Sequence, residues 1–331
     1  MKLHSLSISG LITINMHSLN NEGAEGNTTM TRMVEIVDAE GKNHTVNAIS
    51  GDMFKHIQAE HLFMDAKTNG LPLCEGCKNF DANRIRSDEA YGKEILSMKE
   101  FKKAEETNKI DSFVLDKILT KCVIDDCEGI MITGWGGSKS LSRKSSVEFG
   151  WIIGLPDITR TESYFHAKYV REGKGKGSGS EENLGQNIFH QPASSGQYAV
   201  VVNLDLYKVS RNDITLEYVS GVKRDERIKA LLKSVLNTFI KPAGAKRNTQ
   251  LPHILNFKGV IATSLSTLPA PVMSSLNPDY LEQIKKIAEN LNKLASNTIK
   301  TNEFTDIAAF SEKMTEIINS VQPYENKNGG R

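Results

Sequence analysis

The fold is organised around residues 3–33, which read LHSLSISGLITINMHSLNNEGAEGNTTMTRM. The first half predicts a strand, because apolar side chains largely alternate with Ser and Thr from Leu6 to Ile14. The second half is rich in Asn and Gly, which favours positive φ angles and free backbone amides. It leads into three Thr residues and Arg32, which suit a phosphate-rich ligand. The alternative is a long surface loop between two strands.

The composition is that of an ordinary globular protein. The chain has 331 residues, of which 39% are apolar and 24% are charged, so it can form one large domain or two smaller ones. No apolar run approaches the roughly 20 residues of a membrane span. The first residues lack the apolar core of a signal peptide, so we expect a cytoplasmic protein that contacts no membrane.

The charge balance conceals local clusters of basic residues. The net charge is only +1, whereas a free-standing nucleic-acid-binding protein is usually more basic. The Lys and Arg residues gather, however, and a groove can be positive while the whole chain is neutral. The clusters are Lys139 with Arg143 and Lys144, residues 168–176, Lys223 and Arg224 with Arg227, and residues 241–247.

Four cysteines predict a metal site. Disulfides are disfavoured in a cytosolic chain, and the Cys74-Glu-Gly-Cys77 spacing is typical of half a zinc knuckle. We predict a structural zinc held by Cys74, Cys77, Cys122 and Cys127, with no open position for water. The alternatives are free thiols, or a ligand set that His44, His56 or His61 completes.

The hydrophobic pattern predicts a mixture of helices and strands. Residues 66–121 are charged and weakly periodic, which indicates an inserted helical or zinc-bearing subdomain. Residues 163–197 predict a protruding hairpin with a Gly- and Lys-rich tip. The predicted helices are 51–65, 223–240, 277–296 and 305–320, and the predicted strands include 33–38, 44–49, 122–135, 147–153, 198–209 and 255–262.

No enzyme motif is present. The chain has no GxSxG, no HExxH and no GxGxxG after a strand, and the loop Gly134–Ser138 lacks the spacing of a P-loop. Asp125 and Asp126 are adjacent, so on a strand they would point to opposite faces. His166 and His190 could face each other across the hairpin, which is the pair that a metal-independent ribonuclease would need.

Four motifs resemble one family in their order along residues 3–265. They are SISGLITINMHSLNNEGAEGN, SGDMFKHIQAEHL, SRKSSVEFGWIIG, and SYFHAKYV followed by NIFHQPASSGQYAVV. The chain resembles the DevR type of Cas family seven, the CRISPR-associated backbone subunit of Cascade. This resemblance implies an α+β fold: a ferredoxin-like or RRM-like antiparallel sheet (palm) over residues 1–331, with insertions, a thumb hairpin at 163–197 and C-terminal helices at 277–320.

The secondary-structure order agrees with that implication. A β-α-β-β-α-β order is the ferredoxin-like or RNA-recognition-motif arrangement. We assign its six elements to segments that begin near Leu6, Gly51, Val123, Phe149, Lys223 and Leu255.

The resemblance also implies a non-catalytic function. Such subunits polymerise along a CRISPR guide RNA with other Cascade subunits, and present the guide for pairing with target DNA. Phosphate contacts would give affinity without sequence preference. Carried onto this chain, the palm residues are Asn15, Asn20, Asn27, Arg32, Ser50, Lys55 and His56, with Lys139, Arg143 and Lys144 at the edge. The thumb residues are Tyr164, His166, Lys168, Tyr169, Arg171, Lys174, Lys176, Ser195 and Gln197.

The chain departs from the family pattern at two points, and two alternatives to guide-RNA binding remain. The first loop carries more Asn and Gly than basic residues, so that Arg32 alone would supply its charge, and the Cys-bearing insertion is not part of the general family pattern. Residues 15–31 also contain no Asp, which argues against the target-RNA cleavage of type III relatives. The first rival is a metal-independent endoribonuclease acting through His166 and His190 or His56. The second is a scaffold whose hairpin binds protein.

Overall fold

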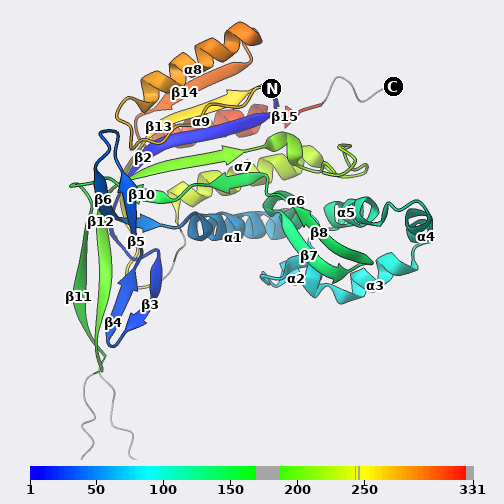
Figure 1. Ribbon diagram of the computed structural model, residues 1–331, viewed down its shortest axis with the longest axis horizontal. Coiled ribbons are helices and arrows are strands. Elements are labelled where there is room, and N and C mark those ends of the chain that lie inside the picture. Colours follow the sequence, from blue (N-terminus) through cyan, green and yellow to red (C-terminus); the bar gives the residue numbers. More distant parts are fainter. Residues whose placement is uncertain (169–186, 243, 245–246, 326–331) are drawn as a thin grey trace, which may run out of the picture.

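A large antiparallel sheet runs through the molecule (Figure 1). The computed structural model describes residues 1–168, 187–242, 244 and 247–325. The strand order is β14-β13-β2-β12-β10-β6-β5, and each neighbouring pair is antiparallel. These strands are β14 (Ile299–Phe304), β13 (His253–Ser264), β2 (Ser5–His17), β12 (Asn187–Leu204), β10 (Ile152–Gly154), β6 (Asn43–Ile49) and β5 (Met33–Val37).

Strand β2 lies between β12 and β13 and is buried on both faces. Its alternation places Leu6 and Ile8 in the main apolar core. The serines between them face a different segment: Ser5 Oγ accepts from the Ala270 N–H, and Ser7 Oγ donates to the Pro271 carbonyl at 2.6 Å. The predicted strand is therefore confirmed, and its polar side is satisfied by a loop more than 260 residues away in the sequence.

Helices cover the apolar face of this sheet. They are α1 (Gly51–Asn69), α7 (Arg224–Ile240) and α9 (Ile307–Ser320), and α1 and α9 both pack against α7. Aromatic rings join α7 and α9 to the sheet: Phe239 stacks on Phe257 with centroids 4.7 Å apart, and Phe310 meets Phe257 at 4.9 Å. All three helices were predicted from the spacing of their apolar residues.

The opposite face is covered beside β13 and β14 by α8 (Tyr280–Leu294), which Figure 1 shows in orange above the sheet. Tyr280 and Ile284 of this helix pack on Val260 of β13. The sequence predicted helices in this C-terminal part. It did not predict β14, whose six residues, IKTNEF, carry too weak an alternation to be recognised as a strand.

A helical insertion follows α1 and lies at the far end of that helix from the hairpins (Figure 1). Its elements are α2 (Glu75–Lys78), a 3-10 turn (Arg84–Ser87), α3 (Glu89–Ser97), α4 (Lys99–Glu106), α5 (Ile110–Lys121), α6 (Val123–Glu128), β7 (Ile130–Trp135) and β8 (Ser138–Arg143). The prediction of a strand pair or one long strand over 122–135 is wrong in its first half, because a short apolar run does not distinguish a buried helix from a strand.

This correction changes the assigned β-α-β-β-α-β order. Val123 begins α6, so it cannot supply the second strand. The strands that take its place are β9 (Val147–Phe149) and β10, which both pair with β12, and then β12 itself, which pairs with β2. In the part of the chain that the structure describes, no helix is both long and apolar enough to cross a membrane.

Two hairpins extend from one end of the sheet. The longer one consists of β11 (Arg160–Lys168) and the first half of β12, paired from Arg160 with Ser195 to Lys168 with Asn187. The shorter one consists of β3 (Asn21–Glu25) and β4 (Thr28–Thr31), and it touches β12 through the His190 N–H, which donates to the Asn27 carbonyl. The sequence predicted the first hairpin and read the second as an open loop.

Candidate nucleic-acid interface

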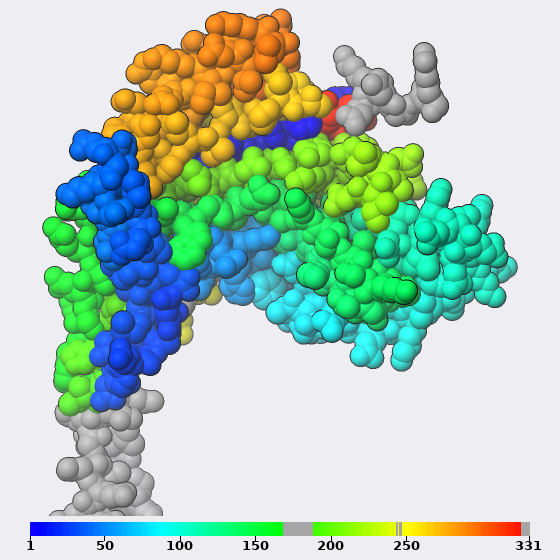
Figure 2. Space-filling model, viewed as in Figure 1, coloured from blue at the N-terminus to red at the C-terminus, as the bar shows by residue number. Residues whose placement is uncertain are grey.

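One face of the molecule is hollowed. Figure 2 shows this hollow between the blue column, which contains β3–β6, and the cyan helical insertion, with α1 at its back. A cavity of about 370 Å³ opens beside α1. Its lining contains three side chains that are basic or can become so, Lys55, His56 and Arg84, together with the aromatic ring of Phe80 and the carboxylates of Asp52 and Asp81.

The start of α1 is fixed by two of the predicted palm residues. Ser50 is the N-cap, and its side chain accepts from the Met53 N–H at 3.2 Å. Asn20 is buried, and its Oδ1 accepts from the Ser50 N–H at 2.9 Å. The structure therefore joins Asn20 and Ser50, but it uses their polar side-chain groups within the protein.

Lys55 and His56 lie one turn further along α1, at the cavity. Lys55 Nζ donates to the Glu128 carbonyl at 3.3 Å, and burial lowers the pKa of this ammonium. His56 is exposed, with its ring centroid 5.5 Å from that of Phe80. The pair thus offers one cation and one exposed aromatic ring to a ligand in the cavity.

Arg84 faces Lys55 from the insertion. Its guanidinium donates to the Gly129 carbonyl. The nearby carboxylate of Glu128 is fully buried and, among the described residues, accepts no hydrogen bond; burial raises its pKa. The charges of Lys55 and Arg84 oppose this rise in the pKa of Glu128.

The other predicted residues of the first segment are spread along the two hairpins. Asn15 is half-buried in β2, and Asn27 is exposed at the β3–β4 turn. Arg32 is half-buried, with its guanidinium 5.0 Å from the ring centroid of Trp151 and paired with Glu22. Arg32 therefore lies beside the hairpins, away from the residues that line the cavity at Lys55.

The long hairpin places its aromatic side chains on both faces. Tyr164 is exposed, and His166 lies opposite Phe189, with their rings stacked at 5.5 Å. Ser195 Oγ accepts from the Met16 N–H, and the Gln197 carbonyl accepts from the Leu155 N–H. Only the backbone of Lys168 is described, and the predicted Tyr169, Arg171, Lys174 and Lys176 lie outside the described residues.

The predicted pairing of His166 with His190 is wrong. His166 is opposite Phe189, whereas His190 is opposite Phe165. Because directly opposed residues of an antiparallel pair share a face and neighbours alternate, the two histidines point to opposite faces of the hairpin. A two-histidine ribonuclease centre cannot form there.

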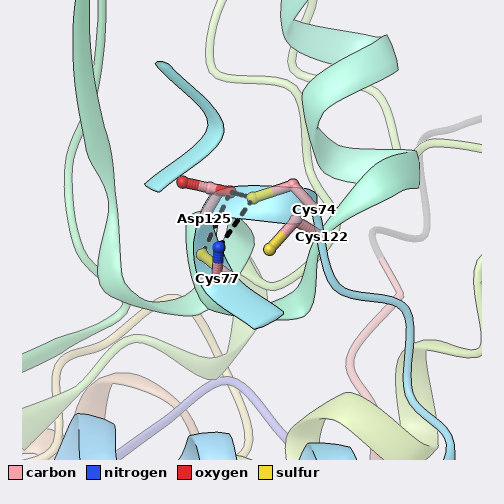
Figure 3. A group of neighbouring side chains, drawn as sticks. All are labelled: Cys74, Cys77, Cys122 and Asp125. Atoms are coloured by element: carbon pink, nitrogen blue, oxygen red, sulfur yellow. Dashed lines mark hydrogen bonds between the residues drawn. The ribbon is translucent and has the colours of Figure 1, made fainter. Parts of the chain in front are cut away.

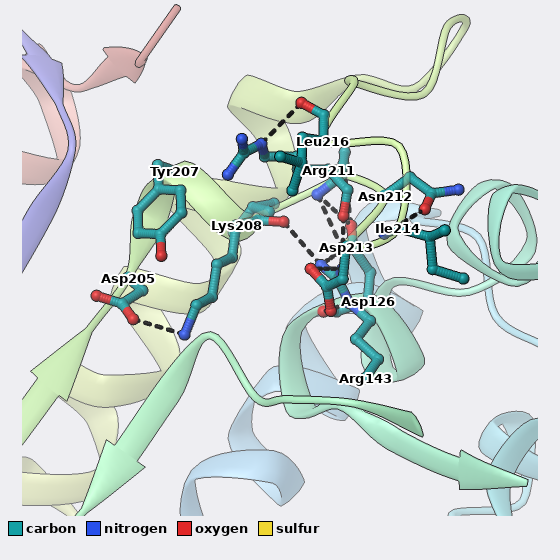
Figure 4. A network of polar contacts seen from close by, with 12 residues as sticks. Asp126, Arg143, Asp205, Tyr207, Lys208, Arg211, Asn212, Asp213, Ile214 and Leu216 are labelled. Carbon is teal, nitrogen blue, oxygen red and sulfur yellow. Dashed lines mark hydrogen bonds and ion pairs between the residues drawn. The ribbon is translucent and has the colours of Figure 1, made fainter. Parts of the chain in front are cut away.

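The β7–β8 hairpin divides its three predicted basic residues. Lys139 and Lys144 are exposed on β8 and just after it. Arg143 is buried: its guanidinium pairs with Asp126 at 2.8 Å and donates to the carbonyls of Lys208 and Arg211 (Figure 4). The expectation that Arg143 contacts phosphate is therefore wrong, because all three nitrogens of its guanidinium group donate hydrogen bonds inside the protein.

The cysteine set differs from the predicted one in its fourth member. Cys74, Cys77 and Cys122 come together with Asp125, in a buried group that could hold a metal ion (Figure 3). Cys127 is buried elsewhere, since α6 is a helix and residues two positions apart lie on different sides of it. His44 instead contacts Asp38, and His61 contacts the Lys241 carbonyl.

The sequence analysis missed three residues of these sites. Phe80 and Arg84 line the cavity, but they belong to a segment that the pattern marked only as charged and weakly periodic. Asp125 was recognised as one of a carboxylate pair, but on the wrong kind of element. Its position three residues after Cys122 could have suggested a shared helix face, had that run been read as a helix.

Comparisons with known proteins agree on one family. The family model described as "CRISPR-associated negative auto-regulator DevR/Csa2" matches residues 8–285. The CRISPR-associated protein Cas7/Cst2/DevR of Methanocaldococcus jannaschii is 26% identical over 311 residues, covering 87% of this chain and 90% of that protein.

A solved structure shares the fold. A chain titled "CRISPR RNA-guided surveillance complex" aligns with a TM-score of 0.51 at 12% identity, over 96% of this chain and 99% of that one. A second, titled "CRISPR RNA-guided surveillance complex, pre-nicking", aligns over the same shares at 12% identity with a TM-score of 0.49. The first of these likenesses shows that the two chains have a common fold.

Proposed function

The chain belongs to the DevR/Csa2 family of Cas7-type CRISPR-associated proteins, and from this membership we propose that it is a guide-RNA-binding backbone subunit of a CRISPR surveillance complex. In this proposal, copies of the chain line up along the guide RNA in the cytoplasm, together with other subunits of a Cascade-like complex. The observation that carries the proposal is the cavity beside α1, where Lys55, His56 and Arg84 converge.

The sheet supports an RRM-like palm. Strand β2, helix α1, strands β9 with β10, strand β12, helix α7 and strand β13 occur along the chain in the β-α-β-β-α-β order, with β3–β6, the insertion and β11 placed between them. We propose that the chain is a single palm domain with the helical insertion after α1, a thumb formed by β11 and β12, and a C-terminal region of α8 and α9.

The contacts available in the cavity and on the thumb suit a variable guide. Lys55 and Arg84 can approach phosphate oxygens, and contacts of this kind give affinity and register without reading sequence. The exposed rings of His56 and Tyr164 can stack on bases, which is also tolerant of sequence. The base edges then stay available, and the target DNA strand is read by pairing with the guide.

We propose that the subunit holds RNA without cutting it. Residues 15–31 carry no Asp, and His166 and His190 point to opposite faces of the hairpin. A binding subunit protects RNA in proportion to its own amount, whereas a ribonuclease would shorten RNA supplied in excess. The two functions therefore predict opposite fates for excess RNA.

The test is assembly on RNA. The full chain, mixed with a guide-type RNA, is measured by light scattering with absorbance at nucleic-acid and protein wavelengths. We expect a large particle rich in RNA for the unchanged protein. For Lys55→Glu we expect the Kd for RNA to rise about tenfold or more, because a charge-assisted contact is replaced by repulsion.

A matched control uses a lysine on the far side of the sheet. Lys293 lies in the last turn of α8, so Lys293→Glu makes the same change of charge outside the hollowed face and should leave RNA binding intact. Circular dichroism checks that both variants fold. A monomer that ignores guide RNA at low salt would refute the proposal, and RNA shortened in excess would replace it by the ribonuclease.

A further inference from the structure

Three cysteines and one aspartate converge in the insertion, behind the wall of the cavity. The ligand atoms of Cys74, Cys77, Cys122 and Asp125 all lie within 4.8 Å of one another, and all four residues are buried (Figure 3). They come from three places: Cys74 and Cys77 from the first turn of α2, Cys122 from the junction of α5 and α6, and Asp125 from α6. Such convergence of soft ligands is typical of a structural metal site.

The carboxylate of Asp125 is oriented as a ligand would be. Its Oδ2 lies 3.3 Å from Cys74 Sγ and 3.7 Å from Cys77 Sγ. Its other oxygen, Oδ1, accepts from the backbone N–H of Ile85 at 3.4 Å. One oxygen therefore faces the sulfurs while a backbone group holds the other, which is how outer hydrogen bonds fix a monodentate carboxylate.

The backbone around Cys74 is also arranged for a thiolate. The Cys77 N–H points at Cys74 Sγ, with the two atoms 3.4 Å apart, so the two cysteines share a tight turn. Gly76 between them lies against the backbone of Arg84, where an added Cβ would come within 1.9 Å of the Arg84 carbonyl oxygen. The short Cys-Glu-Gly-Cys segment thus packs directly against the turn that carries Ile85.

We infer that Cys74, Cys77, Cys122 and Asp125 form a structural zinc site, in which Asp125, and not Cys127, is the fourth ligand. Zinc accepts three thiolates and one carboxylate oxygen in a tetrahedron, at about 2.3 Å and 2.0–2.2 Å. Each thiol that binds releases its proton to solvent. Because the protein supplies all four ligands, no position is left for water or substrate.

The site has a consequence for the cavity. Cys77, Phe80 and Arg84 line the cavity and belong to the segment that the metal would hold, while Ile124 of its lining lies next to Asp125. Zinc would therefore fix the wall that faces Lys55 and His56. This part of the inference depends on the proposed RNA-binding function, whereas the metal site itself does not.

Metal content tests the ligand set directly. The full chain is purified, supplied with Zn²⁺, dialysed without chelator and analysed by elemental mass spectrometry. We expect one zinc per chain, its loss in Cys122→Ala and Asp125→Ala, and its retention in Cys127→Ala. The last variant is the matched control, because Cys127 is equally buried but lies outside the group.

A second variant covers the case in which Asp125→Ala does not fold. Asp125→Cys keeps a fourth ligand, so it should bind Zn²⁺ and Co²⁺. With Co²⁺, its sulfur-to-metal absorption should exceed that of the unchanged protein by about one third, because four thiolates replace three. Equal absorption in the two proteins would show that Asp125 is no ligand.

Other outcomes overturn the inference. Zinc lost from Cys127→Ala but kept by Asp125→Ala would restore the four-cysteine set. A zinc-free protein with four reactive thiols, or with a Cys74–Cys77 disulfide, would show that no metal site exists. RNA binding is measured on the same samples: zinc bound without RNA binding refutes the proposed function and leaves the metal site standing.

Discussion

The sheet and the helical insertion share one apolar core but differ in their buried polar contacts. Around β2, β12 and β13, stability comes from apolar side chains such as Ile8, Phe257 and Phe310, which are fully buried. The insertion adds apolar residues such as Ile118 and Leu119 to this core, and it also carries buried polar groups: Asp125 faces the cysteines, and Asp126 faces two arginines, of which Arg227 belongs to α7. Neighbouring carboxylates on α6 thus serve two separate sites.

The comparison indicates where single substitutions should lower the stability of the molecule most. An apolar core loses stability in proportion to the atoms removed, and it relaxes around small changes. A buried polar network has no such tolerance, because removing one member leaves its partners charged and without hydrogen bonds. We therefore expect the joint between insertion and sheet to respond most strongly to single substitutions.

The largest effect is expected at Asp126. Its carboxylate pairs with Arg143 at 2.8 Å and Arg227 at 2.6 Å, and it also accepts from the Ser210 N–H. Asp126→Ala takes the paired carboxylate from the buried Arg227 and leaves Arg143 only the partly exposed Asp213, so the free energy of unfolding should fall by about 3–5 kcal/mol. Urea denaturation at neutral pH, followed by circular dichroism, measures this loss.

Asp213 provides the control for this prediction. It also pairs with Arg143, at 3.2 Å, but its side chain is 34% exposed. Asp213→Ala should cost no more than about 1 kcal/mol, because a pair open to solvent contributes little. Equal losses from the two substitutions would contradict the view that the buried network, and not charge alone, fastens the insertion.

The next effect concerns a polar site inside the sheet. His17 ends β2, and its Nε2 lies 2.8 Å from the Tyr198 hydroxyl. Burial lowers the pKa of His17 to about 4, so the unfolded chain binds a proton more readily between pH 6.5 and pH 4. The stability that the neutral ring contributes is complete above pH 6.5 and is lost as the pH falls toward 4, by about 3 kcal/mol.

The pH dependence of unfolding in urea measures this contribution. In His17→Phe the group that titrates is gone, so the slope between pH 4 and 6.5 should flatten by the share that His17 supplies. If the variant keeps the full slope, His17 is not the group responsible. A flattened slope would show that His17, inside the sheet, affects the free energy of unfolding about as strongly as the polar contacts between the insertion and the sheet.

The smallest effect is expected in the apolar core of β2. Ile12 is fully buried, and Ile12→Val removes one methylene group, so the free energy of unfolding should fall by about 1 kcal/mol. Leu255 of β13 is 65% exposed, and Leu255→Val should change the free energy of unfolding by no more than a few tenths of a kcal/mol. A loss at Ile12 as large as that at Asp126 would remove the contrast between the two regions.

Much of the sheet and its helices could be predicted from the sequence, because the signal is local. The alternation from Leu6 to Ile14 and the apolar stripes of α1, α7 and α9 follow from the geometry of a strand and a helix. The order of motifs was sufficient to suggest the DevR family, which the family model confirms over residues 8–285. The failure at residues 122–128 has the same origin, since a run that short carries no clear period.

The candidate sites depended on contacts between distant segments. The family resemblance marked Arg143 as an RNA contact, and residue type and spacing marked Cys127 as a metal ligand. The tertiary structure turns Arg143 inward to Asp126 and brings Asp125, and not Cys127, to the other three cysteines. The path of α6 decides both outcomes, because its helical twist sends Asp125 and Asp126 in different directions. Residue type and period determined which elements form; only their packing decided which side chains remain free to bind a ligand.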